Sequence, residues 1–284
     1  MPARILETHR RLFTDLPGVP KILHRLRGML ADPDIPLEAV GARIAADRAL
    51  AEGFLSMRRL PFFGTVSALD RVEECVQVLG RDKTRTLLGI LEAYRLVETS
   101  EQDVAQLKAL VWRHGLAVAE AAVAIAVGSL CDSLGGVPDV RALDRVFTWG
   151  LVHDIGRLLM LRHGPGDVLE IEEEVRLRGG DRLELERDVF GFSHDELGAA
   201  FLLTWGFDEE TVLAVRKHHA IDDQAPDALT WLHLGEVAVM RMAGEDAHPQ
   251  EGLLEWLGFT WDDVRAWVRG GTPLGAPPGE SLVT

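Results

Sequence analysis

Cysteine is scarce in this sequence of 284 residues, and the two that occur, Cys75 and Cys131, stand far apart. Two cysteines cannot form a disulfide framework, and neither has the second cysteine nearby that a thiolate metal site requires. We therefore expect two small buried side chains and no role for the thiols.

Long uncharged apolar segments are missing as well. The run at residues 116–130 is too short and too weak for a membrane-spanning segment, and residues 1–11 carry charges where a signal peptide has an apolar stretch. The sequence therefore predicts a cytoplasmic location and no membrane partner.

An excess of positive charge is also absent. The chain has 45 acidic and 30 basic side chains and a formal net charge of −15, which argues against binding of DNA or RNA because affinity for the phosphate backbone comes from clustered Lys and Arg. The acidity is uneven: residues 1–100 hold 13 acidic and 15 basic side chains, whereas residues 101–284 hold 32 and 15. This contrast predicts a division of the chain near residue 100.

Alternating apolar runs bounded by tight turns are hard to find, while apolar residues recur at spacings of three and four. The sequence therefore predicts an all-α fold. Ser193 with Glu196 has the form of a capping box, and Asp208 and the pair Thr260 and Asp263 are typical of helix starts. Helices are predicted at 19–30, 37–46, 49–58, 68–78, 82–97, 101–130, 143–162, 167–187 with a break at Gly179-Gly180, 193–206, 209–219, 228–242, 251–257 and 262–268.

These helices are expected to form four parts. A multi-helix N-terminal lobe covers residues 1–100, and a helical bundle forms the core at 101–246. Two C-terminal helices lie within 247–270. The last residues, 271–284, are rich in Gly and Pro and are predicted to be disordered.

Three ionisable positions lie on helix faces that are otherwise apolar. His114 has Leu110 among its apolar neighbours at helical spacing, Asp154 follows His153 in the middle of an apolar stripe, and Glu236 repeats the anomaly on a third helix. A buried imidazole needs a hydrogen-bond partner, and a buried carboxylate is costly unless a cation or a donor meets it.

Taken singly, each of these residues is more often a core residue satisfied by a carbonyl, a helix cap or an Arg. Taken together, imidazoles and carboxylates that face inward from separate helices can supply the ligands of a divalent metal such as Mn²⁺, Fe²⁺, Zn²⁺ or Mg²⁺. Such a metal lowers the pKa of a bound water and produces a nucleophile for phosphate-ester hydrolysis.

Three more histidines extend this candidate set. His194 lies in the first turn of the capped helix, and His218 and His219 close the helix at 209–219. Each has a plainer alternative: His194 as a surface residue at a helix start, and the pair as a C-terminal cap favoured by the helix dipole. Both alternatives stay open at this point.

The order of several motifs along the chain is informative. They are Leu16-Pro17-Gly18-Val19-Pro20, Leu30-Ala31-Asp32-Pro33-Asp34, Phe62-Phe63-Gly64, His114, Gly150-Leu151-Val152-His153-Asp154-Ile155-Gly156-Arg157, Phe192-Ser193-His194-Asp195-Glu196, Trp205-Gly206-Phe207 and Arg216-Lys217-His218-His219. In this order they resemble the HD superfamily, and more narrowly the HD-related output domain (HDOD) of bacterial signalling proteins, over about residues 15–242.

The resemblance implies a mostly regulatory and catalytically silent family, with an HD-like core and a distal acid ligand at Glu236 where HD phosphohydrolases usually have Asp. Compared with the HD-GYP cyclic-dinucleotide phosphodiesterases, the chain has histidines at 114, 153, 194, 218 and 219 but lacks the Gly-Tyr-Pro signature after His219. It also has Arg157 where those enzymes have Lys, and Arg cannot donate a proton at neutral pH.

Two functions follow. The favoured one is a non-catalytic signal-transduction protein that can bind a metal or a nucleotide in a degenerate HD site and meets signalling proteins through its N-terminal lobe. The basic residues that could face an acidic partner there, or simply be solvated, are Arg25, Arg27, Arg58, Arg59, Arg81, Lys83 and Arg85.

The alternative is a metal-dependent phosphodiesterase or phosphohydrolase. In that arrangement His114, His153, Asp154 and Glu236 hold one metal, and His194, His218 and His219 complete a second, with Asp154 between them. Arg157 then neutralises a substrate phosphate.

Overall fold

The computed structural model describes residues 21–57, 69–97, 99–132, 139–219 and 228–270. Within these ranges every regular element is a helix, as the sequence predicts. The motif at 16–20, Phe62-Phe63-Gly64, Arg58, Arg59 and the tail at 271–284 lie outside the described residues. The helices are α3 (Lys21–Ala31), α4 (Leu37–Ala45), α5 (Arg48–Met57), α6 (Val72–Leu96), α7 (Gln102–Asp132), α8 (Val140–Val152), α9 (Ile155–His163), α10 (Pro165–Arg178), α11 (Arg182–Phe190), α12 (His194–Thr204), α13 (Glu209–Lys217), α14 (Ala228–Met242), α15 (Leu253–Leu257) and α16 (Trp261–Gly270).

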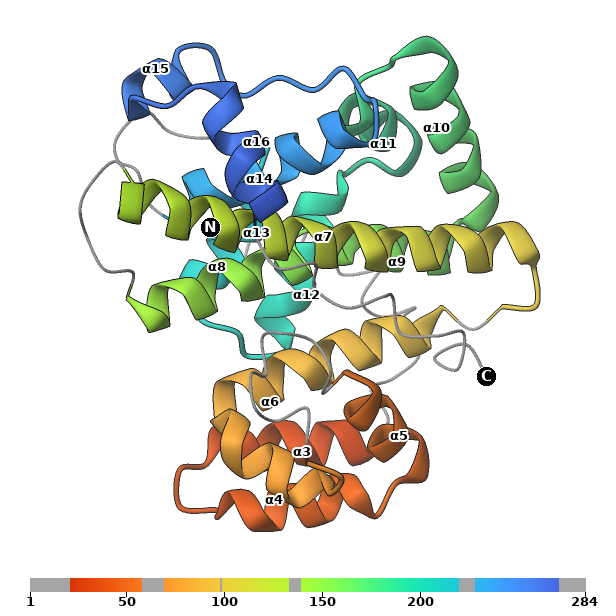
Figure 1. Cartoon of the computed structure of the whole chain (residues 1–284). Helices are drawn as coiled ribbons and strands as arrows, with labels where there is room; N and C mark the ends of the chain where they lie inside the picture. The colour runs from red at the N-terminus through yellow and green to blue at the C-terminus, as the bar shows by residue number, and fades with distance from the viewer. Residues whose placement is uncertain (1–20, 58–68, 98, 133–138, 220–227, 271–284) are drawn as a thin grey trace.

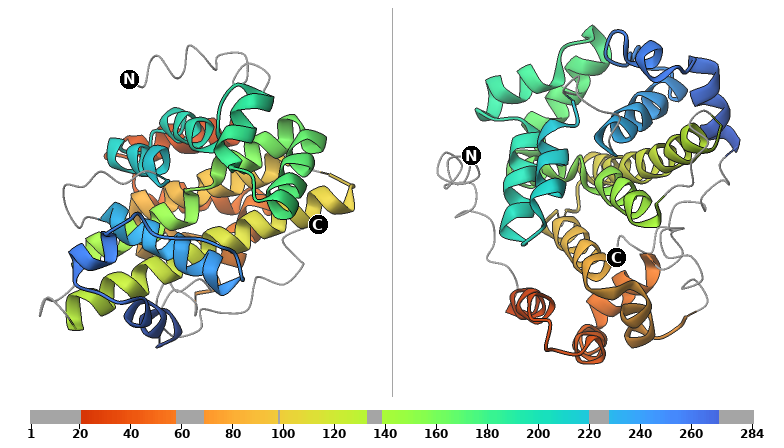
Figure 2. Two further views of the ribbon diagram at one scale, coloured as in Figure 1. Left: turned by 90° about the horizontal axis from the view of Figure 1, so that it is seen from above. Right: turned by 90° about the vertical axis from the view of Figure 1, so that its left-hand side faces the viewer.

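Helices α3, α4 and α5 gather with α6 at one end of the molecule, and the helices from α7 onward form the larger part (Figure 1; Figure 2, right). Helix α6 joins the two, because it packs against α4 and α5 on one side and against α9 on the other. One hydrophobic cluster runs from Leu23 on α3 through Leu88 on α6 to Val215 on α13. The apolar core is therefore continuous across residue 100, where the charge balance of the chain changes.

Helix α6 contains the break that the sequence places between two predicted helices. Gly80 has φ 73° and ψ −176° inside an otherwise continuous element, a conformation that favours glycine. Next to it, Arg81 donates to the carbonyls of Met29 at 3.1 Å and Pro33 at 3.0 Å. The kinked helix is thus tied to the end of α3.

Helix α7 is the long central helix of the larger part, with α8 and α14 packed along it. Two glycines permit this close packing: a Cβ on Gly150 would come within 2.4 Å of the Ala119 Cα, and one on Gly235 within 2.8 Å of the Ala122 side chain. Within the described residues, α7 is long and apolar enough to cross a membrane by length and composition, but half of its most apolar window is buried by these neighbours. It is the core helix of a helical bundle.

Two expectations about α7 are wrong. Leu110, expected on the buried face with His114, is 52% exposed, and Cys131, expected to be buried like Cys75, is exposed near the end of the helix. Among the described residues, no neighbouring helix buries either side chain. A continuous apolar run does not by itself indicate which of its residues face the core.

The single helix predicted at 143–162 is also wrong. The chain leaves helical geometry at Asp154, with φ −96° and ψ 12°, and α9 begins at the next residue. No Pro stands there to signal the break, so its cause is tertiary: α9 must turn to pack against α12, where Gly156 meets the backbone of His194. The break places His153 and Asp154 at a corner between two helices instead of on a helix face.

Candidate metal centre

All seven residues predicted as metal ligands lie in one region, between α7, α8, α9, α12, α13 and α14. They form two groups, and within each group the ligand atoms lie within 4.8 Å of one another. The first group is Asp154, His194, His218 and His219, and the second is His114, His153 and Glu236. The plainer alternative for His194 as a surface residue does not hold, because its side chain is fully buried. His218 does occupy the C-cap position of α13, as its plainer alternative has it, and its side chain is fully buried as well.

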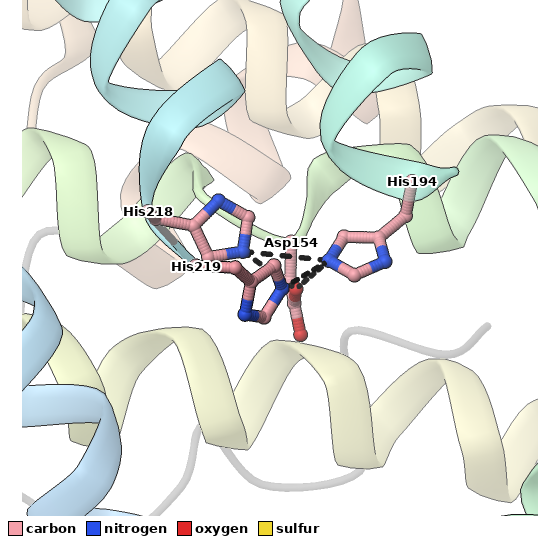
Figure 3. Close-up of side chains that lie close together, drawn as sticks. All are labelled: Asp154, His194, His218 and His219. Atoms are coloured by element: carbon pink, nitrogen blue, oxygen red, sulfur yellow. Dashed lines mark hydrogen bonds and ion pairs between the residues drawn. The ribbon is translucent and has the colours of Figure 1, made fainter. Parts of the chain in front are cut away.

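In the first group three imidazoles surround one carboxylate oxygen (Figure 3). His194 Nε2 lies 3.2 Å from Asp154 Oδ1, and His218 Nε2 lies 3.8 Å from the same oxygen. His219 Nε2 lies 3.0 Å and His218 Nε2 3.4 Å from His194 Nε2. Four ligand atoms therefore converge on one point from three helix ends.

The spacing of these atoms fits a small divalent cation. For metal–nitrogen bonds of about 2.0–2.1 Å, a tetrahedral site places its ligand atoms about 3.3 Å apart. The distances from His194 Nε2 to the other three atoms are 3.0, 3.2 and 3.4 Å. Three imidazoles and one carboxylate are a donor set suited to Zn²⁺, Fe²⁺ or Mn²⁺.

The second group offers two imidazoles and one carboxylate. His153 is fully buried, and its Nε2 has no hydrogen-bond partner, an arrangement that is costly unless another group meets this nitrogen. Glu236 is buried on α14 and lies 3.7 Å from His219 Nδ1 through Oε1. The His114 side chain is 22% exposed, and it is the least buried member of this group.

Three imidazole rings are oriented by hydrogen bonds from their outer nitrogens. His153 Nδ1 donates to the Gly150 carbonyl and His218 Nδ1 to the Val215 carbonyl, both at 2.7 Å. His194 Nδ1 donates to the buried carboxylate of Glu186, also at 2.7 Å. Because each Nδ1 is occupied, each Nε2 faces the centre, which is the orientation that outer partners impose on metal-bound histidines.

The buried charges shift the pKa values of these groups in different directions. Burial lowers the pKa of His153 to about 4 and that of His218 to about 3, so both imidazoles are neutral at pH 7. Burial acts against protonation of His194 too, but its bonds to Asp154 and Glu186 outweigh this and raise its pKa to about 10. Burial, followed by the charge of Asp154, raises the pKa of Glu236 to about 8.

Asp154 is the acid that stays ionised. Burial favours its neutral form, but the imidazoles of His153 and His194 and the guanidinium of Arg157 together hold its pKa well below the usual range. Arg157 lies 2.7 Å from Asp154 Oδ2 and 2.7 Å from Glu172 Oε1. Arg182 also contacts Glu172, through Nη2 at 3.0 Å. Arg157, expected to face a substrate phosphate in an enzyme, is engaged here by two protein carboxylates.

A further Arg joins the two segments that carry the histidines. Arg216, at the end of α13, pairs with Asp195 and donates to Glu196 at 2.8 Å in the first turn of α12. The capping box predicted from Ser193 and Glu196 is present at the same turn. These contacts hold His194 against His218 and His219.

Sequence reasoning missed the outer carboxylates. Glu172 on α10 and Glu186 on α11 belong to the acidic segment that the sequence presents as a solvated helix, yet Glu186 is 3% exposed. The signal that could have found Glu186 is its spacing: Leu183 and Phe190 stand three and four residues away, on the same helical face. The same pattern marked Asp154 and Glu236.

The family model for the HDOD domain matches residues 16–221 of this chain. The chain belongs to the HDOD family. The match spans both the first helices and the histidine-bearing motifs, so the resemblance stated from the sequence is confirmed. Glu236 lies beyond the matched residues.

Relatives of this HDOD chain are distant in sequence. An uncharacterized protein of Treponema pallidum is 24% identical over 205 residues, which are 72% of this chain and 38% of that protein. The chain thus spans less than half the length of this relative.

Solved structures share the fold. An HDOD domain protein of unknown function from Geobacter sulfurreducens is 21% identical with a TM-score of 0.59, covering 95% of this chain and 90% of its own. A candidate metal-dependent phosphohydrolase from Shewanella amazonensis is 18% identical with a TM-score of 0.57, and the match covers 99% of this chain and 94% of that protein. A candidate signal transduction protein from Marinobacter aquaeolei is 18% identical with a TM-score of 0.63, and the match covers 93% of this chain and 58% of that protein. At these identities the likeness concerns the all-α fold alone.

Proposed function

We propose that this HDOD protein is a signal-transduction protein that binds a divalent cation between α9, α12 and α13 and acts through protein partners without turning over a substrate. The observation that carries the metal is the convergence of three histidine Nε2 atoms and Asp154 Oδ1 at 3.0–3.8 Å. Imidazole nitrogens and a carboxylate oxygen at these distances repel one another or compete for protons unless a cation binds all of them.

The regulatory role is supported by the burial of most of the histidines in the centre. His153, His194 and His218 are fully buried, and the partly exposed side chains of the set are His219 at 31% and His114 at 22%. A hydrolase needs space for both a substrate and an attacking water beside the metal. A cation held mainly by buried side chains is suited to stabilising one conformation.

A physical route from the metal to the first lobe exists in the helix contacts. Asp154 is the residue at the N-cap position of α9, and α9 packs against α6, which also packs against α4 and α5 of the N-terminal lobe. A cation that fixes the position of Asp154 would thus fix the start of α9, which packs against α6. Coupling of this kind lets binding of a small ligand change affinity for a protein partner.

The proposed protein partner binds the N-terminal lobe, but the basic side chains of this lobe give that binding little support. Four of the basic residues suggested for it have partners inside the protein: Arg27 lies over the Trp205 ring, Arg81 bonds carbonyls, Lys83 pairs with Asp144, and Arg85 pairs with Asp82.

A second candidate, a metal-dependent phosphohydrolase, is favoured by one specific observation. The two ligand groups lie side by side with Asp154 between them: its Oδ1 is 3.7 Å from His153 Nε2, and its Oδ2 is 3.9 Å from His114 Nε2. Two adjacent metals around a shared carboxylate are the arrangement of many phosphate-ester hydrolases.

Metal analysis combined with an assay separates the two. The full chain, purified without chelator and supplied with Mn²⁺ or Fe²⁺, is tested against bis(p-nitrophenyl) phosphate and a cyclic dinucleotide. We expect bound metal and no hydrolysis. Hydrolysis that Asp154→Ala abolishes would establish the phosphohydrolase instead, and absence of metal would overturn both.

A further inference from the structure

The two oxygens of the Asp154 carboxylate have different partners. Oδ1 faces the first ligand group, 3.2 Å from His194 Nε2. Oδ2 is turned toward the second group, 3.9 Å from His114 Nε2, but its nearest neighbour is the Arg157 Nη1 at 2.7 Å. A carboxylate that bridges two cations gives one oxygen to each. Here a guanidinium already holds the second oxygen.

The guanidinium is held firmly in that place. Its other nitrogen donates to Glu172 at 2.7 Å, and Glu172 is in turn held by Arg182. The Arg157 side chain is 13% exposed. A guanidinium stays protonated in proteins, and its planar fork matches two carboxylates at once. Arg157 therefore cannot make room by losing its proton, and it cannot leave Asp154 Oδ2 without breaking a buried ion pair.

We propose that Arg157 is a built-in cation that takes the place of a second metal, so that this chain holds one divalent cation per molecule. That cation lies on Asp154 Oδ1, His194, His218 and His219. The group of His114, His153 and Glu236 stays without metal, because a dication there would lack the bridging oxygen and would face the guanidinium charge at short range. The inference rests on the proposed metal binding and adds its stoichiometry and the residue that sets it.

The test is the number of metal ions bound. The full-length wild-type protein and the variant Arg157→Lys are titrated with Zn²⁺ or Mn²⁺ by calorimetry, and metal content is measured by mass spectrometry after dialysis. An ammonium is a compact charge that can bind one carboxylate at a time, so in the Lys variant Oδ2 becomes available. We expect one equivalent in the wild type and two in Arg157→Lys. Arg162→Lys, at the exposed end of the same helix α9, is the matched control and should stay at one.

A second variant tests the anchor without touching the guanidinium. Glu172→Gln removes the negative charge beside the second nitrogen of the Arg157 guanidinium. We expect this variant to bind a second metal ion with an affinity at least tenfold lower than that of Arg157→Lys. Two equivalents in the wild type would overturn this inference while leaving the metal function intact. One equivalent in both Arg157→Lys and Glu172→Gln would overturn it as well. No metal in any of the proteins would overturn the proposed function itself.

Discussion

At the scale of single residues, the centre is built from groups that are each unfavourable alone. A buried His153 Nε2 without a partner, an ionised Asp154 and three converging imidazoles all carry a desolvation cost. A cation bound by Asp154, His194, His218 and His219 offsets that cost for these four residues. The groups that accept hydrogen bonds from the Nδ1 atoms decide whether the cation can bind, because they fix which nitrogen of each ring faces inward.

The strongest of these outer partners is Glu186, which accepts both the backbone N–H and the ring Nδ1–H of His194 at 2.7 Å. We expect Glu186→Ala to weaken binding of Zn²⁺ about 10–100-fold, the range measured when such partners are removed. Glu186→Gln keeps an oxygen acceptor for both bonds and should lose less. Competition with a chromophoric chelator measures the affinity.

The control for this prediction is Glu184→Gln, at an exposed position two residues away on α11. It should bind Zn²⁺ as the wild type does. Equal affinity in Glu186→Ala and Glu184→Gln would show that Glu186 does not position His194.

Metal binding should also release protons. In the metal-free protein His194 and Glu236 have pKa values of about 10 and about 8, so both carry a proton at pH 7. A metal on His194 must displace its proton, and affinity should then rise about tenfold per pH unit between pH 6 and 9 for each proton released. Calorimetry in buffers of different ionisation enthalpy counts the protons. A count of zero at pH 7 would contradict this protonation state.

At the scale of helices, the corner between α8 and α9 is the decisive feature. The sequence predicts the helix, its apolar stripe and the inward-facing acid, because all three follow from spacing. It does not predict the break at Asp154, because the cause is the packing of Gly156 against the His194 backbone, which is a contact 38 residues away along the chain. Local propensity carries no record of such a contact.

The same reasoning explains which site residues could be found in advance. His114, Asp154 and Glu236 interrupt apolar stripes, and His194, His218 and His219 lie in motifs at helix ends. Glu172 and Glu186 sit in a segment whose composition is typical of a solvated helix, so their burial depends on how α10 packs against α9 and α11. That packing is a property of the assembled bundle.

Gly156→Ala tests the corner directly. A Cβ there would lie 1.9 Å from the His194 carbonyl oxygen and 2.8 Å from the Gly198 nitrogen, both backbone atoms. Overpacking of this kind costs about 1–3 kcal/mol, and we also expect metal affinity to fall because His194 must move. Urea denaturation gives the free energy of unfolding. Gly166→Ala on α10, where a Cβ meets nothing within 4 Å, is the control and should change little.

At the scale of the whole molecule, the two parts share one apolar core, and a buried acid lies close to their junction. Glu92 on α6 is 2% exposed, with one carboxylate oxygen lacking a hydrogen-bond partner. Burial raises its pKa to about 7, and the charge of Arg27 offsets this only in part. Arg27 itself lies over the Trp205 ring at the end of α12, 5.0 Å from its centroid.

The raised pKa makes stability depend on pH at this junction. The folded protein keeps a proton on Glu92 that the unfolded chain releases, so the stabilisation is complete below pH 4.5 and is lost as the pH rises through 7. Between pH 5 and 8 the wild type should lose about 2–3 kcal/mol relative to Glu92→Gln. Urea denaturation across this range measures the difference. The exposed Glu38→Gln should follow the wild type, and parallel curves for wild type and Glu92→Gln would contradict the prediction.

A divalent cation bound between α9, α12 and α13 can be located directly in crystals. The most direct measurement is anomalous diffraction at the zinc edge from crystals of the full chain soaked in Zn²⁺. We predict a peak enclosed by Asp154 Oδ1 and the Nε2 atoms of His194, His218 and His219. Crystals that show no anomalous density at that position, with Zn²⁺ bound elsewhere or not at all, would rule out this metal site.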